Sequence, residues 1–205
     1  MIDSIQWLGY GGFVIQGTPL IYINPWRLSR VTFLADIILI GHGHYEHFSP
    51  SDIEKVRGPN TLILTNSFVA AQVPGAEVLR EYQSRVVDRV RITAIPAYSP
   101  TSPVHRREDG GLGFLISVNL YDIYYAGDTQ VTPEVQRVAP DIAILPIDGN
   151  GTMAVEEAAL LVREMRPRYV IPCNWGVGGV TQADAERFGR LVGERSEVRI
   201  PVMPK

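Results

Sequence analysis

The sequence predicts an α/β fold in which two β-sheets pack together with helices on their outer faces. Short apolar runs, separated by glycine and proline turns, open the chain and read as strands, and a similar set begins near residue 112. Each set is followed by a stretch in which strands and helices alternate. Because this order occurs twice, we expect two similar halves, each contributing one sheet and its helices.

The composition is that of an ordinary globular protein, and we expect one domain over residues 1–205. Apolar residues make up 45% of the chain and charged residues 20%. The net charge of -3 and the absence of a basic run argue against a nucleic-acid partner. Cys173 is the single cysteine, which excludes an internal disulfide framework and fits a reducing compartment.

Hydropathy and the first residues of the chain bear on its location. No apolar run approaches the roughly 20 residues needed to cross a bilayer, so we expect no membrane partner. Residues 1–4 lack the basic-then-apolar pattern of a signal peptide. A cytoplasmic location is therefore predicted, whereas no pattern in the sequence fixes the oligomeric state.

The first part of the chain predicts an antiparallel sheet rich in hairpins. Its expected strands are residues 4–8, 12–16 and 20–23. Residues 27–35 follow no clean period and are predicted to form a surface loop. The further predicted strands are residues 36–40, 61–64, 90–97, 112–119, 123–126, 142–145, 168–171 and 197–202.

Helices are predicted between these strands. The first is expected to begin after Ser49, which caps it. The others are expected at residues 67–72, 133–138, 153–165 and 181–192. The helix at 153–165 has the clearest pattern, because its small and branched apolar residues recur at helical spacing along one face. Thr152 is predicted to cap this helix, and Thr181 is predicted to cap the last one.

A loop at residues 41–47 holds three of the four histidines of the protein. It follows the buried strand expected at 36–40 and contains His42, His44 and His47 together with Glu46. In extended chain the side chains of His42 and His44 point to the same side and can reach one ion. Imidazoles crowded beside a carboxylate at a strand end are typical of a metal site.

Other predicted strands also end in side chains that could join this loop. Asp128 follows one strand, Asn174 follows another, and Tyr98 and His105 lie just past a third. Each has an ordinary structural interpretation when taken alone. Asp128 could cap a turn, Asn174 could be a turn residue, Tyr98 could pack in the core, and His105 could be exposed among arginines.

Motifs spread over nearly the whole chain match those of one known family. Residues 42–47 read HGHYEH and match its H-x-H-x-D-H motif, and residues 124–129 read YYAGDT and match its G-D-T segment. Residues 5–15 resemble its first hairpin, residues 24–26 its D-P-[FW] turn, and segments between 145 and 172 its closing part. The chain thus resembles the metallo-β-lactamase superfamily, most closely its small metal-dependent hydrolases of the ascorbate-lactonase-like branch. The resemblance implies a four-layer αββα sandwich with metal in a cleft at one edge.

Five positions depart from the family pattern. Glu46 and Asn24 stand where the motif and the turn have aspartate. Tyr98 and Asn174 stand where the resemblance places two further histidine ligands, and Tyr10 stands where related proteins often have a histidine. A tyrosine ligates well only as the phenolate, from a pKa of about 10. The carbonyl oxygen of asparagine is a weak ligand for zinc.

The remaining residues can still hold one divalent ion per chain, which we expect to be zinc, manganese or iron. One possible set is His42 and His44 with Asp128, and another is His47 with Asp128 and Glu46. His105 could replace a lost imidazole, because its loop begins at the position where one is missing.

Two functions stay open on the sequence alone. One is a metal-dependent hydrolase of a small molecule, in which Asp128 or Glu46 orients a water that attacks an ester, lactone, amide or phosphodiester. The alternative is a non-catalytic binding or scaffold protein that has kept the fold and lost full metal binding. The altered residues at the expected ligand positions motivate this second interpretation.

Overall fold

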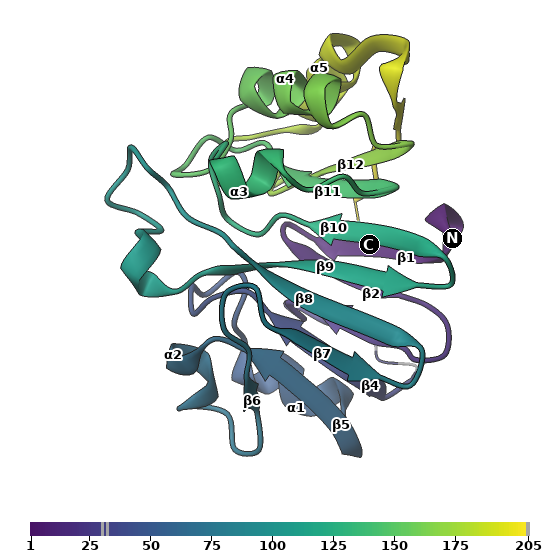
Figure 1. The fold of residues 1–205 in the computed structure, drawn as a ribbon, viewed down its shortest axis with the longest axis vertical. Coiled ribbons are helices and arrows are strands. Elements are labelled where there is room, and N and C mark those ends of the chain that lie inside the picture. Colours follow the sequence, from purple (N-terminus) through teal and green to yellow (C-terminus); the bar gives the residue numbers. More distant parts are fainter. Residues whose placement is uncertain (30, 32, 204–205) are drawn as a thin grey trace.

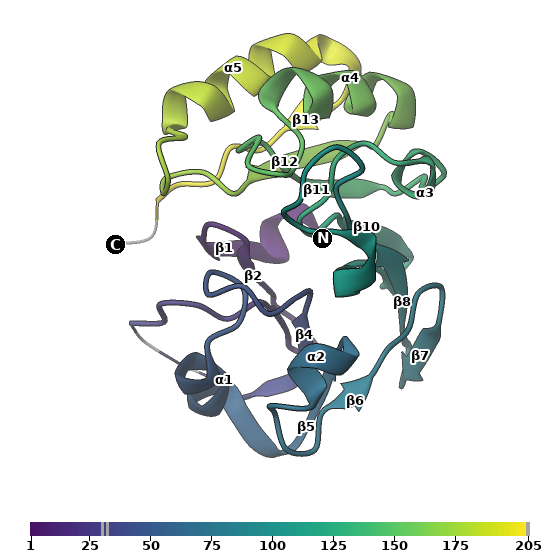
Figure 2. The ribbon, with the colours of Figure 1, turned by 90° about the vertical axis from the view of Figure 1, so that its left-hand side faces the viewer.

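Two β-sheets face one another across the core of the structure, and helices cover the outer face of each (Figure 1). The computed structural model describes residues 1–29, 31 and 33–203. Figure 2 shows the layers in turn: α4 and α5 on one side, the two sheets between, and α1 and α2 on the opposite side. The predicted four-layer αββα architecture is confirmed.

The first sheet has six strands in the order of the chain. They are β1 (Ile5–Gly9), β2 (Gly12–Ile15), β3 (Ile21–Ile23), β4 (Ala35–Ile40), β5 (Arg57–Thr65) and β6 (Glu77–Val78). Strands β1 to β3 pair antiparallel, as expected, but β3 to β6 pair parallel. The predicted antiparallel pairing of the first three strands is confirmed, whereas the later strands pair parallel because longer crossovers return the chain to the start of each one.

The second sheet repeats this mixed pattern with seven strands, in the order β13-β12-β11-β10-β9-β8-β7. They are β7 (Ser84–Val87), β8 (Val90–Pro96), β9 (Leu112–Val118), β10 (Tyr121–Tyr125), β11 (Ile142–Pro146), β12 (Tyr169–Cys173) and β13 (Glu197–Val198). Strands β7 to β10 are antiparallel and β10 to β13 are parallel. The two halves of the chain therefore build similar sheets.

Five helices and three 3-10 turns complete the described part of the chain. The helices are α1 (Pro50–Val56), α2 (Ser67–Ala70), α3 (Pro133–Gln136), α4 (Val155–Met165) and α5 (Gln182–Val192). The turns are η1 (Ile2–Ser4), η2 (Arg107–Asp109) and η3 (Gly193–Arg195). Of the helices that the structure describes, none combines the length and apolar character needed to cross a bilayer.

Strand β4 lies between two apolar layers, which explains its uninterrupted apolar sequence. Ile37 and Leu39 belong to the main core between the sheets, whereas Ile38 and Ile40 belong to a smaller core shared with α1. A strand buried on both faces has no polar alternation, and its end is held firmly in place. This strand leads directly into the histidine loop.

Several boundaries differ from the predictions. The edge strands β6 and β7 were not predicted, because both are exposed and lack an apolar run. The strand expected at 197–202 extends only over β13. The predicted loop at 27–35 includes Arg30 and Thr32, which lie outside the described residues; the rest of this segment is irregular up to the start of β4.

The expected Thr152 cap of α4 was wrong. The N-cap is Ala154, whose N–H donates to Glu157 at 2.9 Å. The hydroxyl of Thr152 donates instead to Asp148. The helix therefore begins two residues later than expected.

Adjacent leucines of α4 give a matched test of the sheet–helix core. Leu161 is 1% exposed and Leu160 is 58% exposed. We expect Leu161→Ala to lower the free energy of unfolding by about 2–5 kcal/mol, since it leaves a cavity in the core. Leu160→Ala should change it by less than about 0.5 kcal/mol. Urea unfolding of the two variants measures this difference, and equal losses would contradict the layer arrangement.

Candidate metal centre

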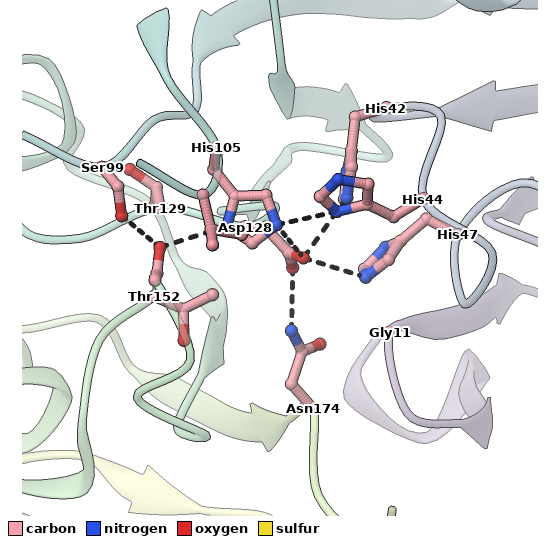
Figure 3. A network of polar contacts seen from close by, with 12 residues as sticks. Gly11, His42, His44, His47, Ser99, His105, Asp128, Thr129, Thr152 and Asn174 are labelled. Carbon is pink, nitrogen blue, oxygen red and sulfur yellow. Dashed lines mark hydrogen bonds and ion pairs between the residues drawn. The ribbon is translucent and has the colours of Figure 1, made fainter. Parts of the chain in front are cut away.

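Loops from both sheets meet at one edge of the sandwich. Figure 3 shows the side chains of His42, His44, His47 and His105 gathered around Asp128, with Asn174 approaching from below. The first three come from the loop after β4, and His105 comes from the long connection between β8 and β9. Asp128 follows β10 and Asn174 follows β12, so the ends of parallel strands supply both.

Two glycines allow these loops to approach one backbone carbonyl. A Cβ at Gly41 would lie 2.7 Å from the oxygen of Leu112, and so would a Cβ at Gly127. Gly127 also has a φ of +69°, which residues with a side chain rarely adopt. Leu112 donates its own N–H to the oxygen of Gly41 at 2.9 Å. This close packing brings the loops after β4 and β10 together.

Asp128 is the centre of the site, and its two oxygens have different partners. Oδ1 accepts a hydrogen bond from Asn174 Nδ2 at 2.8 Å. Oδ2 lies 3.4 Å from His42 Nε2, 3.2 Å from His47 Nε2 and 3.2 Å from His105 Nε2. Burial by itself raises the pKa of Asp128, but the imidazoles of His47 and His42 and the contact with His105 hold it well below its ordinary value. Asp128 is therefore an ionised carboxylate in a buried position.

His105 lies inside the site, not among the exposed arginines that follow it. Its side chain is 8% exposed, and its Nδ1 lies 3.2 Å from the oxygen of Gly151. Because a carbonyl oxygen only accepts, Nδ1 carries a proton and Nε2 is directed at the site. Burial lowers the pKa of His105, but the hydrogen bond and charge of Asp128 outweigh this and raise it. The one sequence signal for this placement was that the loop of His105 begins where the family pattern has a histidine that this chain lacks.

Four side chains present one ligand atom each at metal-binding separations. These atoms, from His42, His44, His105 and Asp128, all lie within 4.8 Å of one another. The observed pairs include His44 Nδ1 to His105 Nε2 at 3.0 Å and His42 Nε2 to Asp128 Oδ2 at 3.4 Å. Ligands about 2.0–2.1 Å from a tetrahedral ion are separated by about 3.4 Å. These two pairs therefore have about the spacing of a four-coordinate site, and the other pairs lie within 4.8 Å.

The state of the imidazoles also fits a metal ion. His42 Nε2 is buried and has no hydrogen-bond partner among the described residues. Burial, reinforced by the neighbouring imidazole of His47, lowers the pKa of His42 well below its ordinary value. Burial and His105 lower the pKa of His44 as well. Neutral imidazoles are the ligating form, so these residues fit a divalent ion.

Two other predicted ligands from the loop at 41–47, Glu46 and His47, are not among these four. Glu46 is half-buried, and the group of gathered ligand atoms among the described residues does not include it. His47 is 1% exposed and lies beside Asp128, but its Nδ1 lies 2.9 Å from Asn24 Nδ2. The second ligand set, with His47, Asp128 and Glu46 around one ion, is therefore not assembled.

The Tyr98 side chain is directed away from the site. Its hydroxyl donates to Glu134 at 3.0 Å and accepts from Arg107 at 3.1 Å. Only its backbone lies near the strand end, held by Thr129 Oγ1 at 3.2 Å and 3.0 Å. This placement argues against Tyr98 as a ligand, because its phenol is already bonded to a carboxylate.

Asn174 acts on Asp128 and does not enter the group of four. It is fully buried with a φ of 60°, and its amide N–H donates to Asp128 Oδ1. The turn conformation expected for an asparagine at this position is thus present. It directs the side chain at the carboxylate that the other loops surround.

A pocket of about 470 Å³ opens onto these side chains. Its wall contains the buried Asp128 and the exposed His44, together with Phe68, Arg106 and Asp109. Arg106 is paired with Asp109 at 2.8 Å, so its charge is largely balanced. The pocket has the dimensions of a small-molecule site.

Comparisons with known proteins agree with this geometry. The profile of a family described as a β-lactamase superfamily domain matches residues 4–174. A UPF0173 metal-dependent hydrolase of Pyrococcus furiosus is 31% identical over 214 residues, covering 96% of this chain and 95% of the relative. A solved structure described as a candidate metal-dependent hydrolase of Parabacteroides distasonis has a TM-score of 0.86 at 25% identity, over 96% of this chain and 91% of that one. Igni18, a metallo hydrolase of Ignicoccus hospitalis, has a TM-score of 0.78 at 25% identity, over 96% and 93%.

The Glu134 carboxylate beside Tyr98 predicts an acid-dependent loss of stability. Burial by itself raises the pKa of Glu134, but Arg107 and Tyr98 lower it from 4.5 to about 2. A depressed pKa stabilises the fold above about 4.5, and this contribution is lost as the pH falls towards about 2. Glu134→Gln should therefore be less stable than the wild type at neutral pH, with the difference shrinking across that window.

Urea unfolding of both proteins at a series of pH values measures this difference. Tyr98→Phe removes one hydrogen bond to Glu134 and should give a smaller difference of the same kind. A difference that stays constant from neutral to acid pH would contradict this role of Glu134.

Proposed function

This chain belongs to the metallo-β-lactamase superfamily, and we propose that it is a metal-dependent hydrolase whose single divalent ion is held by His42, His44, His105 and Asp128. The observation that carries this proposal is the group of four ligand atoms within 4.8 Å of one another. His105 is essential to it, because this residue supplies the imidazole that the family pattern places near Tyr98.

The chain's own residues prepare the site for hydrolysis. A divalent ion at this position would polarise the substrate and make water acidic enough to react near neutral pH. Asp128 balances the positive charge, and Asn174 fixes its carboxylate by binding Oδ1. Burial of His42 and the Gly151 contact of His105 keep their Nε2 atoms directed inwards. Two carboxylates were predicted to orient water. Asp128 is favoured for this role because it belongs to the group of four ligand residues, whereas Glu46 does not.

The ligand types bear on which metal is bound. Three imidazoles and one carboxylate suit zinc or iron better than manganese, which prefers oxygen ligands. Arg106 in the pocket wall is already paired with Asp109, so its charge is not available to an anionic substrate. We therefore propose a small substrate with an ester, lactone or amide bond in preference to an anionic phosphodiester.

The non-catalytic alternative depends on missing imidazoles. His105 weakens that argument, since it occupies the place of one of them, and Asn174 in place of another still holds Asp128. The cytoplasmic location remains a prediction, supported by the single cysteine, Cys173, which is buried and unpaired.

Metal content and hydrolysis test this function directly. Wild-type protein that is stripped and then reloaded should bind about one zinc or iron per chain, measured by elemental analysis. His105→Ala should lower the metal affinity by more than about 100-fold, since it removes a ligand and not an outer contact. Tyr98→Phe is the matched control, because Tyr98 lies in the same loop as His105 but is not one of the four proposed ligands. This variant should keep the metal.

Chromogenic esters, lactones, amides and phosphodiesters serve as probes of activity in the same preparations. Chelation should abolish hydrolysis and added metal should restore it. Absence of stoichiometric metal, or hydrolysis that neither chelators nor His105→Ala affect, would overturn the proposal.

Asn174 provides a graded test, because it touches Asp128 and not the ion. Asn174→Ala removes the hydrogen bond to Oδ1 and leaves this oxygen buried without a donor. We expect metal affinity to fall by about 10–100-fold, less than for loss of a ligand. Competition with a chromogenic chelator measures the affinity, and an unchanged value would show that Asn174 does not orient the carboxylate.

A further inference from the structure

Asn24 determines which nitrogen of His47 carries the proton. Asn24 is fully buried, and the N–H of Gly41 donates to its Oδ1 at 3.0 Å. This bond fixes the orientation of the amide, because a reversed amide would direct its own NH2 group at the Gly41 N–H. Nδ2 of Asn24 therefore faces His47 Nδ1, at 2.9 Å.

The neighbouring hydroxyl of Tyr125 supports the same assignment. Tyr125 has one proton to donate, and its hydroxyl lies 3.1 Å from the oxygen of Gly11, which can only accept. The hydroxyl consequently accepts from Asn24 Nδ2 at 2.7 Å. One N–H of Asn24 is used in this contact. The other has two neighbours, His47 Nδ1 at 2.9 Å and the oxygen of Gly11 at 3.4 Å, and the shorter distance favours His47.

An amide nitrogen cannot accept a hydrogen bond, so Nδ1 of His47 must be the acceptor. The ring proton then lies on Nε2. Nε2 is buried and 3.2 Å from Asp128 Oδ2, although the approach is not aligned well enough to count as a hydrogen bond. A protonated nitrogen has no lone pair to offer a metal ion.

The ring of His47 is also closely enclosed. A Cβ at Gly11 would lie 2.5 Å from His47 Cε1 and 3.0 Å from its Nδ1, so the ring packs directly on this glycine. The ring of Tyr10 lies edge-on to the His47 ring, with the two ring centroids 5.6 Å apart. His105 has the opposite arrangement, because its Nδ1–H donates to the oxygen of Gly151 and its Nε2 faces Asp128 and His44.

We propose that Asn24 locks His47 as a donor towards Asp128, so that His47 is a positioning residue and not a metal ligand, and the chain holds one ion and not two. This inference rests on the proposed function for its metal stoichiometry, but the tautomer of His47 stands on hydrogen bonds of the protein alone. The contact with Asn24 explains how His47, at a ligand position of the family motif, can take no part in ligation.

The tautomer is measured first, on metal-free protein with ¹⁵N-labelled histidine. Long-range ¹H–¹⁵N correlations distinguish Nδ1–H from Nε2–H rings, and His47→Gln identifies the signals by their loss. We expect Nε2–H for His47 in the wild type. In Asn24→Asp, which has the same shape but only acceptor oxygens, His47 should change to Nδ1–H. A wild-type His47 with its proton on Nδ1 would overturn the inference.

Zinc titration then separates a donor from a ligand. His47→Ala should retain about one zinc with affinity reduced about 10–100-fold, the size typical of outer contacts, whereas His105→Ala should lose more. His47→Gln should lie closer to the wild type than His47→Ala, because its side-chain amide, like the Nε2–H of His47, presents an N–H towards Asp128.

Each outcome decides one of the two proposals. Loss of zinc in His47→Ala as complete as in His105→Ala, or two zinc ions in the wild type, would overturn the inference while the hydrolase proposal stands. If the wild type binds no metal at all, the hydrolase proposal and the single-ion stoichiometry both fail. The tautomer assignment would then still be decided by the spectra, which need no metal.

Discussion

The buried carboxylate of Asp128 is the interaction on which the arrangement of this edge depends. An ionised carboxylate taken out of water is several kcal/mol less stable unless charges and donors compensate for the lost hydration. Here one oxygen is bound by Asn174, and three imidazole nitrogens surround the other. Loops after four different strands converge because each contributes a group that this carboxylate requires.

Much of the fold could be predicted because burial leaves a direct trace in the sequence. Strand β4 reads as a continuous apolar run since it is covered on both faces, and α4 shows a clear apolar face. Exposed edge strands such as β7 leave no such trace. The direction of pairing after β3 was not predicted, because it depends on where the crossovers return and not on local pattern.

The site could be predicted only in part, for a related reason. His42, His44 and Asp128 lie immediately after buried strands, so the strand positions fix their locations. His105 lies in a long irregular loop, and its place depends on a carbonyl 46 residues away at Gly151. Likewise, the Tyr98 phenol turns outwards because of a carboxylate on α3. Contacts of this kind follow from tertiary structure and have no local signature.

Four of the residues that depart from the family pattern share one property, which bears on whether the site has decayed or been rebuilt. Tyr10 donates to Asp148, Asn174 to Asp128, and Tyr98 to Glu134, while Asn24 Nδ2 faces the acceptor nitrogen of His47. A decaying site would leave donors and acceptors unmatched in the interior, at a cost of about 1–3 kcal/mol each. Each replacement instead places an N–H or O–H opposite a group that accepts it, and among these four side chains the one buried atom without a partner in the described residues is Asn174 Oδ1. The substitutions therefore form a consistent set. Asn174 binds Asp128 directly, and Asn24 contacts His47, whose Nε2 lies 3.2 Å from the same carboxylate.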